Sequence, residues 1–287
     1  MLSFEQKKEL SENGFILLKN FYDLAEEIEP IQFGIWQIIG VLLKKYKCPV
    51  QQKIFTPDTF DDGYLDLIKK DRKYGGEVYD AVKQIPAFLR LVSAKKNEDL
   101  FFEMRNTNCA GIAGRGFGVR IDNPNEQKYR SLWHYEYRDQ LRSIDGVVFW
   151  TPLVSVTSKL GPVQVCPKSH LGPLRRSYLY DTTNQNKSGA YAMRLENEQQ
   201  LIKKYGIVAP LSEPGDLIIM DFLTLHSSGE NFANRARWSM QFRLFNFLDP
   251  AGQKINWVGG VADGVSLSSV HPELVIGNSS NNMEEKC

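Results

Sequence analysis

The sequence of 287 residues predicts a mainly β fold, an antiparallel barrel or jelly roll, preceded by a helical N-terminal region. Short apolar runs bounded by Gly, Pro and Ser crowd residues 101–250, and they lie too close together for helices between parallel strands. Residues 1–100 instead show helical periodicity. A hydrophobic fraction of 42% is enough for one large domain with its own core.

The helical region is expected to begin with a segment that ends at Asn13-Gly14, because glycine commonly follows the last helical residue. Residues 15–18 then form a short apolar strand. Apolar residues between positions 35 and 43 recur at helical spacing, and this stripe is expected to pack in the core. A further helix is expected over residues 77–94, bent or restarted near Pro86, whose ring interrupts helical hydrogen bonding.

The β region is expected to contain strands at residues 146–150, 162–165 and 217–220. A further run, residues 237–244, alternates with a period of two, so it predicts a strand with one apolar face. Its opposite face carries four polar side chains: Arg237, Ser239, Gln241 and Arg243. This polar face is exposed to solvent or lines a binding cavity, and the alternation leaves both alternatives open.

Composition excludes several classes of partner. The 35 basic and 34 acidic side chains leave a net charge of +1, which favours neither nucleic acid nor an anionic membrane. The most apolar stretch, residues 31–43, is too short to span a bilayer. The four cysteines are scattered without a C-x-x-C pair, which fits a reducing compartment, so we expect a cytoplasmic protein. The polar residues 278–287 are expected to form a disordered tail.

Three residues form the candidate metal site. His134 and Glu136 are two positions apart, so on a strand both would lie on one face and could chelate one ion. His226 follows the predicted strand at residues 217–220 and could supply the third ligand. Two histidines and one carboxylate are the ligand set that holds Fe(II) with open coordination positions. His170, in a turn, and His271, near the C-terminus, compete less well for the role.

Two arginines follow the second histidine of the candidate site. Arg235 and Arg237 come nine and eleven residues after His226, on the same face of the predicted strand. The planar guanidinium group pairs with carboxylate oxygens two at a time, as a dicarboxylate cosubstrate would require. The pattern therefore predicts a non-haem iron oxygenase that uses 2-oxoglutarate. Either Arg235 or Arg237 could be the partner of the cosubstrate.

The order of these segments resembles the phytanoyl-CoA dioxygenase family of Fe(II)/2-oxoglutarate oxygenases. The resemblance covers residues 13 to about 247, and the rest of the first hundred residues match poorly. The matching segments are Asn13-Gly-Phe-Ile-Leu-Leu-Lys-Asn20, Trp133-His-Tyr-Glu136, Phe149-Trp150-Thr-Pro-Leu153, Gly161-Pro-Val-Gln-Val-Cys-Pro-Lys-Ser-His170, and His226-Ser-Ser-Gly229-Glu-Asn231 followed by Arg237. The chain departs from the family pattern at Glu136, where aspartate is usual, and at Tyr135, where glutamine is usual.

The resemblance implies a double-stranded β-helix (jelly roll, cupin-like) core with flanking helices, in one oxygenase domain over residues 1–277. Residues 1–100 would give mostly helical support, residues 101–250 the jelly-roll core, and residues 251–277 a C-terminal extension. It implies Fe(II) bound by His134, Glu136 and His226, and 2-oxoglutarate bound by Arg237, with help from Ser239 and with Trp150 against it.

The implied reaction is hydroxylation of a C–H bond of a small metabolite by dioxygen, coupled to decarboxylation of 2-oxoglutarate to succinate. A rim of arginines at the pocket mouth would favour an anionic substrate; the candidates are Arg138, Arg142, Arg175 and Arg176. The aromatic residues Trp133, Tyr135 and Tyr137 either stack on a substrate or pack in the core. Two other functions stay open: a cupin-like metalloprotein that does not use 2-oxoglutarate, and a non-catalytic binding relative.

Overall fold

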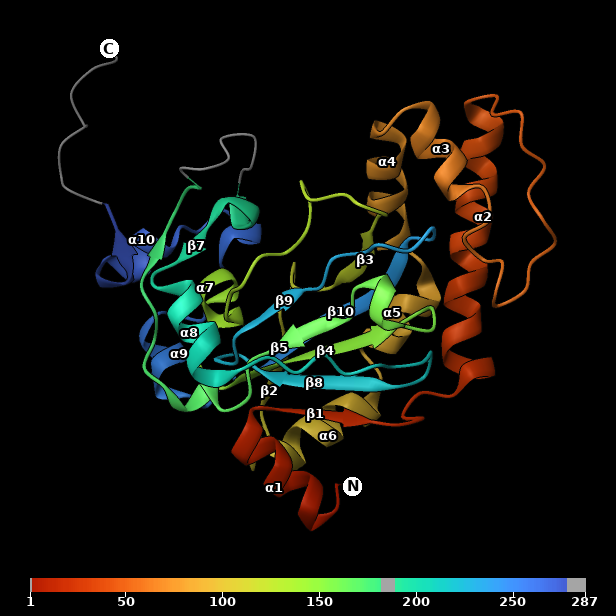
Figure 1. The fold of residues 1–287 in the computed structure, drawn as a ribbon. Coiled ribbons are helices and arrows are strands. Elements are labelled where there is room, and N and C mark those ends of the chain that lie inside the picture. Colours follow the sequence, from red (N-terminus) through yellow and green to blue (C-terminus); the bar gives the residue numbers. More distant parts are fainter. Residues whose placement is uncertain (1, 182–188, 278–287) are drawn as a thin grey trace.

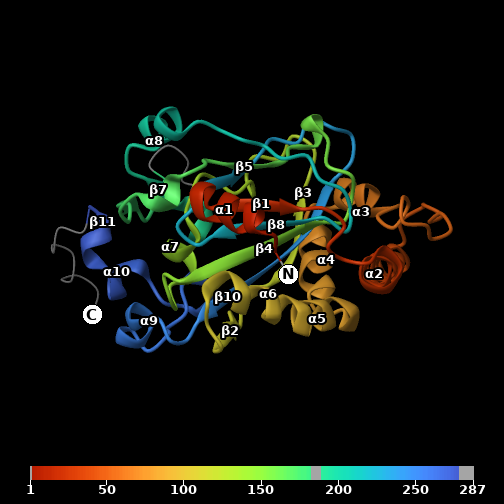
Figure 2. The same cartoon turned by 90° about the horizontal axis from the view of Figure 1, so that it is seen from below.

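The central feature of the computed structural model, which describes residues 2–181 and 189–277, is a six-stranded antiparallel sheet. Its strands run in the order β1-β8-β4-β10-β2, and β3 also pairs with β10. The bounds are β1 Phe15–Leu18, β2 Ala110–Ile112, β3 Gly118–Asp122, β4 Gly146–Pro152, β8 Leu217–Asp221 and β10 Arg237–Asn246. Figures 1 and 2 show this sheet at the centre of the molecule.

Helices from the first third of the chain pack on one face of this sheet, with α1 at its β1 edge (Figure 2). They are α1 Phe4–Asn13, the π-helical turn Leu24–Ile28, α2 Glu29–Lys45, α3 Tyr64–Lys70, α4 Lys73–Val82, α5 Pro86–Val92 and α6 Lys95–Arg105. Trp238 of β10 lies fully buried against Phe60 and Tyr64 of this helical layer. Met240, Phe242 and Leu244 extend the same apolar face into one continuous hydrophobic core, as the alternation along this strand predicts.

A smaller sheet packs on the opposite face. Its strands are β5 Val163–Val165 and β9 His226–Ser228. Isolated bridges extend it at both edges, from His226 to His134 and from Val165 to Val208. The large and small sheets enclose a second hydrophobic cluster. This is the double-stranded β-helix (jelly-roll) architecture, and within residues 2–181 and 189–277 no sheet closes into a barrel.

The C-terminal half adds short elements around one end of the sheets. Three strands, β6 Ser177–Tyr178, β7 Arg194–Leu195 and β11 Val275–Ile276, form a third small sheet. The helices there are α7 Glu136–Gln140, α8 Glu198–Tyr205, α9 Pro250–Lys254 and α10 Leu267–Val270, and there are 3₁₀ turns at Ser158–Leu160, Ser169–Leu171, Gly189–Ala192, Val261–Asp263 and Pro272–Leu274. Figure 1 shows α8 to α10 gathered at the end of the molecule opposite α2.

The expected N-terminal elements are present. Gly14 adopts a left-handed conformation, with φ of 75°, and its N–H donates to Leu10 to end α1. The helix expected over residues 77–94 is restarted, since α4 ends at Val82 and α5 begins at Pro86. No helix in the described part of the chain is long and apolar enough to cross a membrane. The tail expected at residues 278–287 lies outside the described residues.

Candidate functional site

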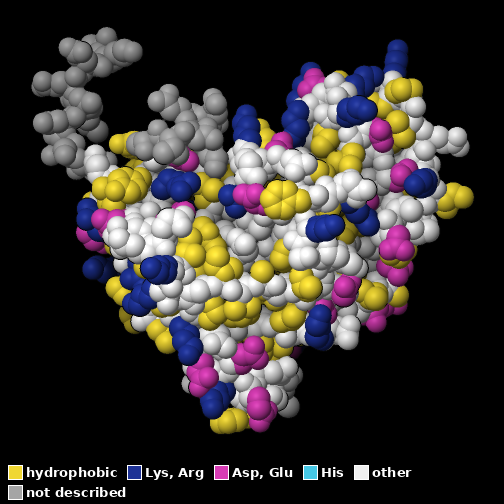
Figure 3. Space-filling model, viewed as in Figure 1, with side chains coloured by type: hydrophobic (Ala, Val, Ile, Leu, Met, Phe, Trp, Pro, Cys, Tyr) yellow, Lys and Arg dark blue, Asp and Glu magenta, His cyan; other side chains and the backbone are white. Residues whose placement is uncertain are grey.

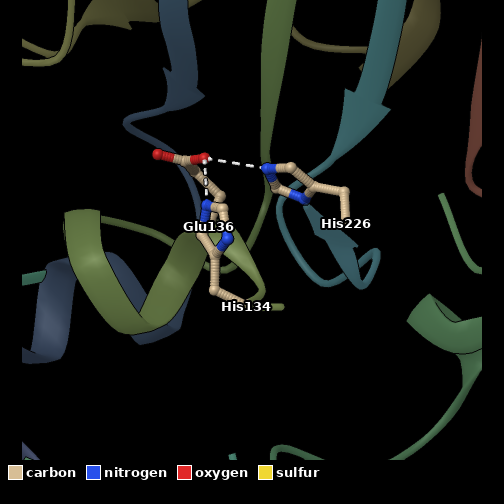
Figure 4. Close-up of side chains that lie close together, drawn as sticks. All are labelled: His134, Glu136 and His226. Atoms are coloured by element: carbon tan, nitrogen blue, oxygen red, sulfur yellow. Dashed lines mark ion pairs between the residues drawn. The ribbon is translucent and has the colours of Figure 1, made fainter. Parts of the chain in front are cut away.

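The three predicted metal ligands converge between the two sheets (Figure 4). His226 is the first residue of β9, and its backbone exchanges two hydrogen bonds with that of His134, of 2.9 and 3.0 Å. Glu136 Oε2 lies 3.5 Å from His226 Nε2 and 3.9 Å from His134 Nε2. The candidate ligand atoms of the three residues lie within 4.8 Å of one another. One metal ion could therefore contact all three.

The structure corrects the expected backbone of the first two ligands. His134 and Glu136 do not share a strand: His134 sits in a single β-bridge, and Glu136 is the first residue of the short helix α7. Tyr135, between them, has extended φ and ψ, so the chain leaves the small sheet directly after His134. The two side chains still meet because the turn into the helix carries Glu136 back toward His226.

Backbone carbonyls fix the tautomers of both histidines. His134 Nδ1 lies 2.7 Å from the Leu132 carbonyl, and His226 Nδ1 lies 2.9 Å from the Thr224 carbonyl. A carbonyl oxygen only accepts, so in each neutral ring Nδ1 carries the hydrogen and Nε2 keeps its lone pair. Both lone pairs are thus on the nitrogens that face Glu136. Metal-binding histidines typically show this arrangement, in which the outer nitrogen donates to the protein.

The titration behaviour of the buried ligands suits a cation. Burial and the neighbouring His226 lower the pKa of His134 well below its ordinary value, so this ring is neutral at physiological pH. Burial raises the pKa of Glu136, but Arg243 and the two histidines lower it by more than burial raises it. The carboxylate therefore stays ionised. Its Oε2 atom is buried without a hydrogen-bond partner. An unpartnered anionic oxygen between two nitrogen lone pairs is a costly arrangement that a metal ion would relieve.

Arg243 fixes the glutamate from the other side. Its Nε donates to Glu136 Oε1 at 2.8 Å, and its Nη1 donates to the Gly116 carbonyl at 2.9 Å. One carboxylate oxygen is thereby held by the arginine, while the other stays free toward the histidines. The sequence placed Arg243 on the polar face of its strand without a role, and that alternation is the only sequence signal for this contact.

Arg237 lies in a buried cluster beside the metal site. Its Nη2 donates to Asp122 Oδ2 at 2.6 Å and to Ser228 Oγ at 3.0 Å, while Nε and Nη1 have no partner. Asp122 is directly opposite Arg237 in the pairing of β3 with β10, and it also pairs with Arg120. Burial raises the pKa of Asp122, but the two arginines lower it more, so it stays ionised. Sequence reasoning missed Asp122 and Ser228.

Ser239 and Trp150 lie near this arginine, as expected. The Arg237 guanidinium carbon is 6.0 Å from the centre of the Trp150 ring. Ser239 follows Arg237 on the same strand face, and its buried Oγ has no hydrogen-bond partner. A cavity of about 50 Å³ is lined by Arg237, Trp150 and both histidines, though not by Ser239. The polar face of β10 therefore turns inward to a cavity and not to solvent.

Arg235 is not in the site. Its Nε and Nη2 donate to both carboxylate oxygens of Asp61, at 3.0 and 2.9 Å. Asp61 also accepts a hydrogen bond of 3.0 Å from Trp238 Nε1. Arg235 thus fastens the helical region to β10, and Arg237 alone of the two lines the cavity.

A larger cavity, of about 450 Å³, adjoins the metal site on the side of His134 and Glu136. Of the four arginines proposed for its mouth, only Arg138 lines it. Arg142 pairs with Asp263, Arg175 donates to Tyr205 Oη, and Arg176 pairs with Glu196. The prediction of an arginine rim was therefore wrong for Arg142, Arg175 and Arg176.

Arg138 itself is 2% exposed, and its Nε and Nη2 pair with Asp139, while Nη1 has no partner.

The remaining sequence candidates have structural roles. His170 lies 3.0 Å from the Ser11 carbonyl through Nε2, and His271 Nε2 lies 2.7 Å from Tyr137 Oη. Neither histidine belongs to the metal-ligand cluster. Tyr135 and Tyr137 are buried in the second hydrophobic cluster, against which Trp133 packs. These aromatic side chains are core residues.

Comparison with known proteins agrees with this geometry. A sequence profile of the family "Phytanoyl-CoA dioxygenase (PhyH)" matches residues 10–239. No curated protein sequence matches the chain.

Three solved structures share the fold. EctD from S. alaskensis, with 2-oxoglutarate and 5-hydroxyectoine, has a TM-score of 0.56 at 18% identity, over 85% of this chain and 76% of that one. The carbocyclase SnoK from nogalamycin biosynthesis has a TM-score of 0.55 at 11% identity, over 91% and 92%. EvdO2 from Micromonospora carbonacea var. aurantiaca, complexed with 2-oxoglutarate, has a TM-score of 0.50 at 14% identity, over 86% and 91%.

The jelly-roll fold, the two histidines with one carboxylate and the family match together define a non-haem iron oxygenase of the 2-oxoglutarate-dependent class. Within that class, the chain belongs to the phytanoyl-CoA dioxygenase family.

Proposed function

We propose that this protein is an Fe(II)/2-oxoglutarate-dependent dioxygenase that hydroxylates a C–H bond of a small, anionic metabolite. Substrate, dioxygen and 2-oxoglutarate would give hydroxylated substrate, succinate and carbon dioxide. One oxygen atom enters the substrate and the other enters succinate. We further propose a cytoplasmic location, which rests on the scattered cysteines in the sequence.

The observation that carries the proposal is a set of unpartnered buried polar atoms. Glu136 Oε2 faces two histidine nitrogens, and Arg237 keeps Nε and Nη1 free a short way along the same cavity. Buried polar groups are normally hydrogen-bonded, so unpartnered ones mark a site where a ligand is expected. A cation would satisfy the first group, and a carboxylate would satisfy the second.

We assign His134, Glu136 and His226 as the ligands of Fe(II), which when bound supplies the dioxygen chemistry. We assign Arg237 to the distal carboxylate of 2-oxoglutarate through Nη1, which has no partner in the protein. Asp122 and Ser228 accept from Nη2, so the plane of the guanidinium group is oriented before the cosubstrate arrives.

We further assign Ser239 Oγ, which is buried without a hydrogen-bond partner although Ser239 does not line the cavity, to the same carboxylate. The Trp150 ring would pack against the carbon chain of the cosubstrate.

Arg138 supports the anionic character of the substrate. Its guanidinium group is buried at the wall of the larger cavity and is paired only along one edge, so Nη1 can donate to a bound oxygen. On the same wall Arg120, Arg138 and Arg243 pair with Asp122, Asp139 and Glu136, which leaves the charge of Arg115 in excess. A carboxylate or phosphate group of the substrate would balance this excess.

Replacing Arg237 by Leu tests the cosubstrate assignment. The variant is expected to bind Fe(II) like the wild type but to lose at least ~30-fold in affinity for 2-oxoglutarate, since a charged hydrogen bond of about 2 kcal/mol or more disappears. The readout is the visible metal-to-ligand charge-transfer band that appears when 2-oxoglutarate is added anaerobically to the Fe(II) protein.

Arg235→Leu is the matched control, because Arg235 pairs with Asp61 outside the cavity, and its band should be unchanged. A band of equal strength in Arg237→Leu would sink the assignment. A wild-type protein that binds iron but gives no band would point instead to a cupin-like metalloprotein without 2-oxoglutarate. Absence of iron binding would point to a non-catalytic relative.

A further inference from the structure

A second pocket, partly open to solvent, adjoins the cavity at the metal site. It has a volume of about 430 Å³, within the range of about 300–1,000 Å³ typical of small-molecule sites. It shares three wall residues with the larger cavity at the metal site: Tyr79, Arg120 and Tyr191. The two cavities are therefore neighbours on either side of a common wall of side chains.

Tyrosine rings dominate the lining of this second cavity. Tyr64 and Tyr79 come from α3 and α4, Tyr129 comes from the segment between β3 and α7, and Tyr191 comes from the 3₁₀ turn Gly189–Ala192. Tyr129 and Tyr191 meet edge to face, with ring centres 6.2 Å apart. Rings arranged in this way offer flat apolar faces with polar tips, which suit stacking against another ring system. We name this space the tyrosine cavity.

Each cation at the tyrosine cavity already has a carboxylate partner. Arg72 pairs through Nε and Nη2 with both oxygens of Glu126, and its guanidinium group lies over the Tyr129 ring at 4.9 Å. Arg120 pairs in the same two-point manner with Asp122. Lys73, the third cation, pairs with Asp71 at 3.0 Å.

Basic side chains gather along the upper edge of the molecule over α3 and α4 (Figure 3). Whether the tyrosine cavity attracts anions therefore depends on whether its three cations are already paired. A cavity whose cations are all paired does not select an anion. This contrasts with the cavity at the metal site, where Arg138 keeps a free Nη1. The two spaces therefore suit different parts of one molecule.

We infer that the tyrosine cavity is a substrate subsite, which holds an uncharged ring system while the carbon to be oxidised lies in the adjoining cavity at the metal site. The substrate class is thus a metabolite with an aromatic or alicyclic ring at one end and an anionic group nearer the reacting carbon. This inference rests on the proposed function for the identity of the occupant as substrate.

Gly76 offers a way to fill the tyrosine cavity without disturbing the core. It lines the cavity within α4, and a Cβ atom added there meets nothing within 4 Å. A tryptophan at this position has room to project over the cavity, and glycine inside a helix is itself unfavourable by roughly 0.5–1 kcal/mol. Gly114, exposed and equally free of neighbours, lies outside both cavities and gives a matched control.

The probe is 2-naphthol, a bicyclic ring that is uncharged at neutral pH. It should bind the wild type and Gly114→Trp saturably, and at least tenfold more weakly to Gly76→Trp, as followed by naphthol fluorescence. Inorganic phosphate should not displace it. Unchanged affinity in a Gly76→Trp protein with wild-type thermal unfolding would overturn the subsite. So would displacement by phosphate, because the cavity would then be an anion site.

A second readout tests the link to the metal site. In protein loaded with Mn(II), the ring protons of bound 2-naphthol should broaden in the NMR spectrum, and they should not broaden in the Zn(II) protein. Binding without Mn(II)-dependent broadening would overturn the substrate assignment. If the wild type did not bind 2-oxoglutarate, the proposed function would be contradicted instead. The naphthol titration would still show whether the tyrosine cavity binds a ring.

Discussion

A single carboxylate divides its two oxygens between an arginine and the metal site. Glu136 stands where the family usually has aspartate, and its side chain is one methylene longer. Arg243 takes Oε1 and leaves Oε2 facing both histidines. The longer, more flexible acid thus has a second fixed point, which restricts the position of its free oxygen. Arg243 acts as a positioning residue, since it contacts Glu136, the proposed metal ligand.

Removing that fixed point should weaken metal binding. Arg243→Met is expected to raise the Kd for Mn(II) by about 10- to 100-fold, as loss of a partner behind a metal ligand typically does. The measurement is calorimetric titration of the metal-free protein. The reason is that Glu136 could then rotate away from the histidines, an effect that we expect to outweigh the loss of one nearby positive charge.

Arg105→Met provides the control, because Arg105 forms a less deeply buried pair with Asp221 away from the ligands. Both variants should lose stability, Arg243→Met by about 3–5 kcal/mol, as expected when one partner of a buried pair is removed. Only Arg243→Met should lose metal affinity. Equal Kd values in the two variants would show that Arg243 serves stability alone.

At the scale of elements, β10 carries most of what the sequence revealed. Its alternation predicted an apolar face in the core, which the buried Trp238 confirms, and a polar face whose environment the pattern left open. The small sheet above β10 turns that face into a cavity wall. The expected strand through His134 and Glu136 was wrong, because a two-residue spacing cannot reveal that the chain enters a helix at Glu136.

Contacts between distant elements were beyond sequence reasoning. The pairs of Glu136 with Arg243 and of Asp122 with Arg237 join residues 107 and 115 positions apart. Nothing local marks either partner. By contrast, the preference for Arg237 over Arg235 rested on the spacing that the family resemblance implies. In the structure Arg235 pairs with Asp61, and the role of Arg237 stays a prediction.

The small sheet depends on close backbone contact at its end. A Cβ atom on Gly229, just after β9, would lie 2.5 Å from the Pro162 carbonyl oxygen and 2.9 Å from the carbonyl carbon of Gly161. Gly229→Ala must therefore push β9 away from β5. We expect it to lower the free energy of unfolding by about 1–3 kcal/mol, the usual cost of overpacking, in urea titrations.

Gly114→Ala should leave the urea midpoint nearly unchanged, because its Cβ would meet open space. If Gly229→Ala were as stable as this control, the two strands would be free to move apart, and the close contact would not matter for the fold.

For the molecule as a whole, the large sheet joins the helical layer to the metal site. One face of β10 packs on the helices, and the other carries the charges of the cavity. The class of fold was predictable, since it follows from strand spacing and periodicity. The three-dimensional grouping of charges depends on which strands become neighbours, and only the assembled sheet determines this.

The contribution of Asp122 to the free energy of unfolding should depend on pH. Its folded-state pKa is lowered, so its stabilisation is present above the unfolded value of about 3.9 and is lost as pH falls through the folded value. Asp122→Asn should cost about 3–5 kcal/mol at pH 7, because two buried arginines lose their carboxylate. The gap between wild type and variant should narrow as pH falls below about 3.9.

Urea unfolding of the metal-free proteins at a series of pH values measures this gap. The exposed Asp58→Asn should show little difference from the wild type at any pH. A gap for Asp122→Asn that stayed constant down to pH values well below about 3.9 would mean that the carboxylate is not the source of the stabilisation.

The carbonyl contacts of the two imidazole rings have a consequence for how the protein recovers from damage. Each ring is anchored by its own segment, through Leu132 and Thr224, and not by the ion. Because the polypeptide itself orients both rings, we expect iron to leave and return without any refolding of the chain. An oxygenase that loses its iron after oxidation could on this basis be restored by a supply of Fe(II) alone, so that the life of the enzyme is set by its protein and not by any one metal ion.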